Sequence, residues 1–183
     1  GRELSQLVGV MHQQFDLVDQ LAVIHNVLAG NLGEWGFFRS LLSLIIPQQR
    51  KEAYEALDRL GIRDKANDKT AHLSGGEQQR VALARLLVQQ PRAILADEPV
   101  ASVDPARARS LLGTLVKIAD EEGITLVVSL HSVDLALEFF PRIIGLRDGS
   151  VQLDRPSMKI DDPDLQSLYE LEDDPTDEKF AAQ

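Results

Sequence analysis

The chain has 183 residues, of which 44% are hydrophobic, so it can bury one good core with a small appended lobe. It has no cysteine, which excludes disulfides and thiolate metal sites and suits a reducing cytoplasm. The net charge of −10 comes almost entirely from the segment between Asp161 and Lys179, and no basic stripe of the kind that binds nucleic acid is present.

The N-terminal third predicts one strand and a helical lobe. The apolar run from Leu7 to Met11 is typical of a buried strand, and polar residues end it. Apolar residues then recur at helical spacing over residues 21–29, 37–46 and 49–60, with glycine or proline between these segments. We therefore expect about three helices in this lobe.

Beyond Gly61 the pattern alternates between helices and strands. The expected helices span residues 75–90, 105–122 and 132–139, and the expected strands span 93–97, 125–130, 142–146 and 150–153. The strands at 93–97 and 125–130 are apolar almost throughout, which is typical of parallel strands covered on both faces. The last two strands flank Asp148 and Gly149, as in a hairpin. The fold class predicted is α/β with an inserted helical lobe.

The acidic C-terminal segment predicts little structure. We expect a short helix around Leu165 to Leu171, followed by a solvated and disordered tail, because the composition is too polar to bury a core.

Residues Ser74 to Glu77 read SGGE, which has two interpretations. Ser74 and Glu77 have the spacing of a capping box at the start of a helix, and this structural explanation is sufficient for the motif taken alone. The same helix start, however, presents bare backbone N–H groups and a positive dipole end to an anion such as a γ-phosphate. Gly75 and Gly76 would let that anion approach closely.

Two adjacent acids, Asp97 and Glu98, follow the predicted strand at residues 93–97. Acids at a strand end are usually just solvated, but in open α/β sheets this edge is where ligands bind. A carboxylate there suits Mg²⁺, which prefers oxygen ligands and keeps part of its water shell. Asp97 is the candidate metal ligand, and Glu98 is the candidate base or orienting group for an attacking water.

Three further residues are weak signals when each is taken alone. Asp104 precedes Pro105 and predicts a helix N-cap. His131 follows the strand at 125–130 and could donate a hydrogen bond to a phosphate oxygen, although a lone histidine there is more often structural. Gln13 follows the first strand, and the same reservation applies to it.

The order of these segments resembles the ATP-binding subunit of ATP-binding cassette (ABC) transporters over about residues 7 to 155. In that resemblance LSGGEQ matches the signature motif, ILADEP the Walker B segment and ASVDP the D-loop. His131 matches the switch histidine, and Gln13 matches the Q-loop glutamine. The segments VMHQQFDLVDQLAVIHNVLAG, ILADEPVASVDP, VVSLHSVDLA and IIGLRDG are similar in particular to the phosphonate importer ATPases. The resemblance implies a P-loop NTPase-like core with a mainly parallel sheet.

The resemblance also implies a role for each matching residue. In the family, two subunits sandwich two ATP molecules, which implies a homodimer. Glu98, His131 and Gln13 would be catalytic, and Asp97 and Gln13 would serve Mg²⁺. The signature residues and the D-loop would meet the ATP held by the partner, and they comprise Ser74, Gly75, Gly76, Gln78 and Asp104.

A division of the chain follows from the same resemblance. Residues 1–20 would form a strand and the Q-loop of the ATPase core, and 21–73 the α-helical subdomain, which continues into the signature helix at 74–90. Residues 91–155 would form the α/β catalytic core, and 156–183 a C-terminal helix and an acidic, disordered tail. The longest apolar runs are too short to cross a bilayer, so membrane contact is expected through a partner. That partner would be a transmembrane permease docked on residues 21–60, with an external solute-binding protein acting indirectly. The subunit would lie on the cytoplasmic face of the inner membrane.

An apolar patch is expected on this lobe. Its region carries eight large apolar side chains, and we expect a minority of them to be exposed for the permease. They are Trp35, Phe37, Phe38, Leu41, Leu42, Leu44, Ile45 and Ile46.

The family's phosphate-binding loop has no counterpart here. The loop ends in Gly-Lys followed by Ser or Thr, and the chain contains no Gly-Lys dipeptide. Only 12 residues precede Gln13, so an N-terminally truncated ATPase subunit is expected. Such a chain should bind nucleotide weakly, hydrolyse ATP negligibly when alone, and self-associate through exposed sheet edges and apolar surface.

Two alternatives to an import ATPase remain open. One is a non-transport cassette ATPase of the DNA-repair or translation type, although its usual coiled-coil insertion or second cassette is not in this sequence, and the charge disfavours nucleic acid. The other is a non-catalytic module that offers its signature helix to the ATP of another chain.

Overall fold

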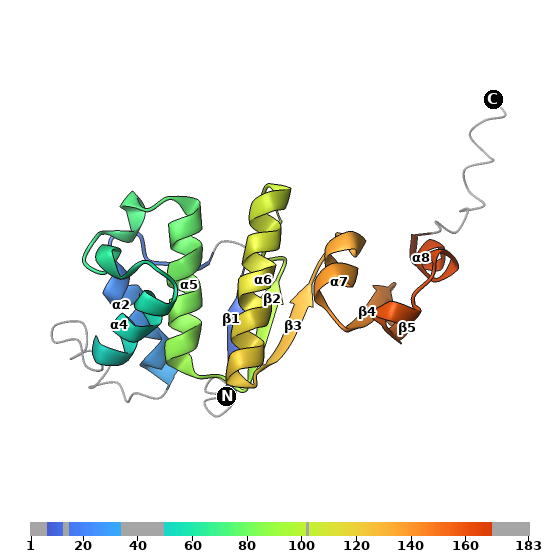
Figure 1. The fold of residues 1–183 in the computed structure, drawn as a ribbon, viewed down its shortest axis with the longest axis horizontal. Helices are drawn as coiled ribbons and strands as arrows, with labels where there is room; N and C mark the ends of the chain where they lie inside the picture. The colour runs from blue at the N-terminus through green and yellow to red at the C-terminus, as the bar shows by residue number, and fades with distance from the viewer. Residues whose placement is uncertain (1–6, 13–14, 34–49, 102, 170–183) are drawn as a thin grey trace. The chain divides into compact units, whose positions relative to one another are not determined.

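The computed structural model describes residues 7–12, 15–33, 50–101 and 103–169 (Figure 1). The chain divides into two compact units, Gly1–His131 and Ser132–Gln183. None of the described helices is long and apolar enough to cross a membrane. The predicted helix at residues 37–46, the eight apolar side chains of the predicted patch and the acidic tail all lie outside the described residues.

The first unit contains a parallel three-stranded sheet in the order β1-β2-β3. The strands are β1 (Val8–Met11), β2 (Ala93–Asp97) and β3 (Thr125–Ser129). Val10 is in register with Leu95, and Leu95 with Val127. The three predicted strands and the parallel pairing are therefore confirmed, with boundaries within one residue.

One face of this sheet packs on two long helices, α5 (Gly75–Gln89) and α6 (Pro105–Glu122) (Figure 1). Met11, Ile94 and Ala96 point into this core and are at most 3% exposed. They form one cluster with side chains of the two helices, namely Leu83, Leu86, Leu111, Leu115 and Ile118. Burial of this apolar area is the main term that holds the helices on the sheet.

The opposite face of the sheet carries an open apolar row. Val10, Leu95 and Val127 lie side by side on the three strands and are 43%, 43% and 54% exposed. The expectation that β2 and β3 are covered on both faces is therefore wrong for the described residues. An apolar run in a sequence shows that a strand favours burial, but it does not show what lies over each face.

A second apolar cluster is built from helices alone. It joins α2 (Val23–Leu28), α4 (Arg50–Arg59) and the outer side of α5, with Val27, Leu57 and Val81 fully buried. Two of the expected lobe helices are thus confirmed. Short 3₁₀ turns complete the connections at η1 (Ala29–Gly33), η2 (Arg63–Lys65) and η3 (Thr70–His72).

A buried polar network ties this helical region together. Asn26, which is 2% exposed, accepts a hydrogen bond from the Val18 N–H at 2.8 Å and donates to the Val18 carbonyl at 3.0 Å. Its amide also donates to Thr70 Oγ1 at 2.8 Å, and Thr70 donates onward to the Leu21 carbonyl at 3.1 Å. Buried polar groups need such partners, so the network fixes the loop after β1 against the turn before α5.

The second unit consists of α7 (Val133–Phe139), the antiparallel pair β4 (Arg142–Arg147) and β5 (Ser150–Pro156), the turn η4 (Ser157–Lys159) and α8 (Asp162–Tyr169). Asp148 and Gly149 join the two strands with φ values of 49° and 74°, the left-handed pair that a two-residue hairpin turn requires. The predicted hairpin is confirmed. Helix α8 begins three residues before the predicted start at Leu165.

Candidate functional site

The carboxyl ends of β2 and β3 bring three polar residues together. Asp97 is in register with Ser129, the last residue of β3. The Ser129 hydroxyl donates to Asp97 Oδ1 at 2.8 Å and accepts from the Glu98 N–H at 2.9 Å. A single hydroxyl therefore links both acids that the sequence singled out.

Glu98 is held in an uncommon backbone conformation. Its φ is 45°, in the left-handed region that non-glycine residues rarely adopt. Its carbonyl accepts from the Ala101 N–H at 3.1 Å, which closes a tight turn after β2. Its carboxylate Oε1 lies 2.7 Å from His131 Nε2, and both side chains reach solvent, at 39% and 82% exposed. The structure thus gathers Asp97, Glu98 and His131 at one sheet edge.

The start of α5 forms the predicted capping box. The Glu77 N–H donates to Ser74 Oγ at 3.4 Å, and the Glu77 carboxylate accepts from the Ser74 N–H at 2.8 Å and from its hydroxyl at 2.7 Å. The hydrogen bond from the Ser74 hydroxyl, followed in size by the one from the Ser74 N–H, holds the pKa of Glu77 below its ordinary value, because both bonds favour the charged carboxylate. The capping box is confirmed.

Gly75 and Gly76 have no evident internal reason to be glycine. Neither has a positive φ, and a Cβ added at either would meet no described atom within 4 Å. By contrast, a Cβ at Gly30 would lie 2.4 Å from the Arg85 carbonyl. Glycine at the two positions therefore serves whatever approaches the helix start from outside, or it is a neutral choice.

The remaining predicted residues are placed less directly. Asp104 caps α6 by accepting from the Arg107 N–H at 3.0 Å, with Pro105 in the first turn, as expected. The Gln78 amide donates to the Thr70 carbonyl at 3.2 Å, so it is used within the chain. Gln13 lies outside the described residues. The signature residues hydrogen-bond among themselves and with Thr70, and the described structure joins none of them to the strand-end group.

The loop after β1 is held by a residue that the sequence did not single out. Phe15 and Asp16 both have positive φ, at 57° and 46°. The Arg85 guanidinium on α5 donates to the Phe15 carbonyl at 2.7 Å and the Asp16 carbonyl at 2.8 Å. Burial lowers the pKa of Arg85, but the group stays charged. The signature helix therefore holds the strained turn that follows Gln13 in the chain.

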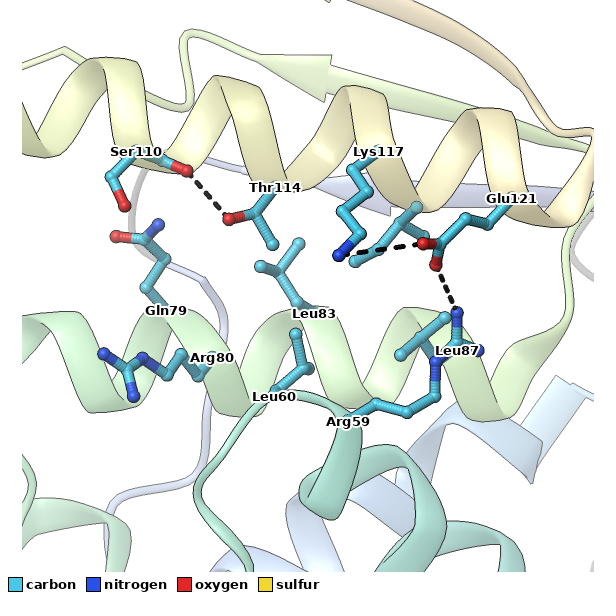
Figure 2. Close-up of a pocket in the computed structure, with 11 residues that line it drawn as sticks. Arg59, Leu60, Gln79, Arg80, Leu83, Leu87, Ser110, Thr114, Lys117 and Glu121 are labelled. Carbon is cyan, nitrogen blue, oxygen red and sulfur yellow. Dashed lines mark hydrogen bonds and ion pairs between the residues drawn. The ribbon is translucent and has the colours of Figure 1, made fainter.

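A groove of about 510 Å³ lies between α5 and α6, with the C-terminal end of α4 at its rim (Figure 2). Leu60, Leu83 and Leu87 form its apolar floor. Arg59 closes one end by bonding Glu122 at 2.6 Å and Glu121 at 3.0 Å. None of the predicted site residues lines this groove.

Mg²⁺ fits the strand-end group as a partly hydrated ion. The described residues hold no cluster of three or more His, Cys, Asp or Glu side chains that could enclose a metal. One carboxylate supported by a hydroxyl, as at Asp97, suits an ion whose other ligands are water and substrate phosphates.

Comparison with known proteins decides the family. The family model described as ABC transporter matches residues 1–101. The chain belongs to the ABC transporter family. The resemblance inferred from its motifs is therefore confirmed.

Two curated proteins that are similar to this ABC chain are both named phosphonates import ATP-binding proteins. The phosphonates import ATP-binding protein PhnC 1 of Nostoc sp. (strain PCC 7120) is 45% identical over 166 residues, which are 91% of this chain and 63% of that protein. The phosphonates import ATP-binding protein PhnC of Escherichia coli (strain K12) is 47% identical over 161 residues, which are 88% of this chain and 62% of that protein. The chain thus spans less than two thirds of the length of these relatives.

Solved structures agree with the predicted fold class. The cassette cbiO1 from Clostridium perfringens, part of the ABC transporter complex cbiONQ, is 27% identical with a TM-score of 0.70 and covers 85% of this chain and 59% of that chain. The cassette MJ0796, solved as a dimer in a post-hydrolysis state bound to ADP and Pi, is 32% identical with a TM-score of 0.66 and covers 85% and 65%. The P-loop NTPase-like α/β class is confirmed.

Proposed function

We propose that this chain is part of an ATP-hydrolysing subunit that energises a membrane importer for phosphonate or a related small anion. The observation that carries the proposal is the convergence of Asp97, Glu98 and His131 at the carboxyl edge of β2 and β3. Ligands of open α/β sheets bind at this edge. Identities of 45% and 47% to phosphonate import proteins support the cargo class.

Each strand-end residue has a proposed role in hydrolysis. Asp97 would hold Mg²⁺, which neutralises charge on the phosphates when it is bound. Glu98 would orient or deprotonate the attacking water. His131 would donate a hydrogen bond to the γ-phosphate. Its contact with Glu98 supports this, because the two side chains, once separated, would both reach a water or phosphate oxygen that enters between them.

The start of α5 would bind the γ-phosphate of ATP held by a second subunit. The capped helix, with space beside Gly75 and Gly76, suits an anion that arrives from another molecule. Ser74 would belong to the same contact, with Gln78 behind it. Asp104, exposed at the start of α6, would lie at the dimer contact.

The other partners and the division of the chain remain part of the proposal. Residues 21–73 would form the helical subdomain, residues 21–60 would dock on the permease, and an external solute-binding protein would deliver the cargo. The compact cluster of α2, α4 and α5 supports a distinct helical subdomain. Gln13 would connect that subdomain to Mg²⁺, and the Arg85 bonds to the turn at Phe15 and Asp16 support a mechanical link there.

Titration of a fluorescent ATP analogue with Mg²⁺ tests the proposal. We would compare this chain with the chain joined behind the N-terminal region of the Escherichia coli relative, which is expected to supply a phosphate-binding loop. Binding by the joined protein alone, with turnover abolished by Glu98→Gln but binding retained, is the expected result. Tight binding by this chain as it stands would overturn the assigned roles.

A second candidate is a non-catalytic module that completes the ATP site of another chain. The capped start of α5, with open space beside Gly75 and Gly76, favours it because this end of the helix can receive an anion held by another chain. Under this function the chain alone would not bind the analogue, yet it would raise nucleotide affinity when mixed with the full-length relative. Gly76→Asp should abolish that rise, since a carboxylate at the helix start repels phosphate.

The cargo has its own test. Cells that lack their phosphonate import ATPase would receive the joined protein and be grown with phosphonate as the sole source of phosphorus. Growth that depends on Glu98 supports the phosphonate assignment. Nucleotide binding and turnover without growth would retain the ATPase function and reject the cargo.

A further inference from the structure

Glu98 keeps a backbone conformation that its own chemistry disfavours. Non-glycine residues persist at a φ of 45° only where their surroundings hold them. The backbone contacts that hold it are few. Its carbonyl accepts from the Ala101 N–H at 3.1 Å, and its N–H donates to Ser129 Oγ at 2.9 Å.

The Ser129 hydroxyl donates one hydrogen bond and accepts another, each with a different acid of the site. A hydroxyl carries one proton, and here that proton is directed to Asp97 Oδ1 at 2.8 Å. A lone pair of the same oxygen receives the Glu98 N–H. The register between β2 and β3 sets Ser129 directly opposite Asp97, so the contact follows from the sheet and not from a flexible loop.

We propose that Ser129 is a positioning residue for the two acids of the site. Its hydroxyl fixes the Asp97 carboxylate by one oxygen and holds the Glu98 backbone so that the Glu98 side chain meets His131. Ser129 itself touches neither water nor phosphate in the reaction. This inference rests on the proposed function for its catalytic consequence, whereas the positioning of Glu98 is a property of this chain alone.

Substitution of Ser129 by Thr and by Val isolates the effect of the hydroxyl group from the effect of side-chain shape. The two side chains have the same branched shape, both suit a strand, and they differ by the hydroxyl alone. Residue 129 is exposed, so the added methyl group has room. Ser129→Thr should therefore keep the positioning and Ser129→Val should lose it, with the fold intact in both.

Two NMR measurements on this chain test the positioning. Exchange of the Glu98 amide should be about tenfold faster in Ser129→Val than in Ser129→Thr, because one hydrogen bond protects it. The ¹⁵N shift of His131 Nε2 should move in Ser129→Val towards its value in Glu98→Gln and should stay unchanged in Ser129→Thr. The amide of Leu115 in the core serves as the control for global opening. Equal Glu98 exchange or an equal His131 shift in the two variants would overturn the inference.

Turnover measured on the joined protein separates this inference from the proposed function. We expect kcat to fall by about 10- to 100-fold in Ser129→Val with KM unchanged, and to be kept in Ser129→Thr, because a small displacement of a catalytic group costs that much. Equal kcat in the two variants, with loss in Glu98→Gln, would overturn the inference and leave the function standing. Full turnover in Glu98→Gln would overturn the function, and the NMR result would then decide the positioning alone.

Discussion

His131 Nε2 lies 2.7 Å from Glu98 Oε1, although both side chains reach solvent and 33 positions separate them in the chain. An exposed polar contact of this kind contributes little to stability because water competes for both partners. The pair is therefore free to open at small cost when a third group enters between the two side chains.

The first prediction concerns the stability that this pair provides. Glu98→Gln and His131→Ala should each change the free energy of unfolding by less than about 1 kcal/mol, with a coupling of the same small size in the double variant. Urea denaturation followed by circular dichroism measures this. A coupling above about 2 kcal/mol would mean that the pair is a structural element and not a movable one.

Arg85, unlike Glu98 and His131, should contribute substantially to the free energy of unfolding. Arg85→Met keeps an unbranched apolar stem but leaves the Phe15 and Asp16 carbonyls without their donor, so we expect a loss of about 2 kcal/mol in the same urea assay. Exchange of the Phe15 amide, which donates to the His12 carbonyl, should accelerate as well. The matched control is Arg80→Met on the same helix, which is exposed and should cost below about 0.5 kcal/mol. Similar losses in the two variants would contradict the proposed hold on the turn.

Thr70 provides a third prediction. Thr70→Val preserves the shape of the side chain but removes the hydroxyl that accepts from Asn26 and donates to the Leu21 carbonyl. The side chains of Asn26 and Thr70 are both buried, so the cost should be about 1–3 kcal/mol. Thr70→Ser keeps the hydroxyl and should lose about 1 kcal/mol for the missing methyl group. Thermal unfolding ranks the two, and a more stable Val variant would show that the network is unimportant.

The capping box predicts a pH dependence. Because the folded chain lowers the pKa of Glu77, its contribution to stability is fully present above about pH 4.5 and is lost as the pH falls through the lowered folded value. Wild type should thus exceed Glu77→Gln in Tm at neutral pH, and the gap should close at acid pH. Tm measured from pH 7 to pH 3 tests this. A Tm difference that widens on acidification would contradict a lowered pKa of Glu77 in the folded chain.

The open apolar row predicts self-association. Val127→Thr keeps the branched shape but makes the exposed sheet face more polar, so the apparent mass in light scattering at high concentration should fall. Thr125 lies two residues earlier on the same face, and Thr125→Val should raise the apparent mass. If the two variants leave the mass equal, association uses another surface or does not occur.

Local patterns predicted the local features well. The capping box at Ser74, the Asp104 cap and the hairpin at Asp148 each depend on a few neighbouring residues whose types limit the backbone. Asp97, Glu98 and His131 were predicted to lie together because each comes at or just after the end of a parallel strand. That rule places residues at an edge, although it gives no contacts between them.

The missed features all depend on distant pairing. The Ser129 bonds require the register of β3 against β2, and a serine in an apolar run carried no signal beyond its position at the strand end. Arg85 meets a turn 70 positions earlier in the chain, and the left-handed backbone at Phe15 is not typical of that residue type. The coverage of β2 and β3 was overestimated because apolar runs do not identify their neighbours.

The Asn26 network also limits where this chain can be recombined with its relatives. Its bonds join residues 18–26 to Thr70, and Gln78 on α5 adds a further bond to Thr70. A hybrid gene whose crossover falls between these segments would combine one parent's loop with the other parent's turn. A hybrid whose crossover lies before Val18 or after Gln78 takes the whole network from one parent. Such hybrids are the ones that we expect to fold.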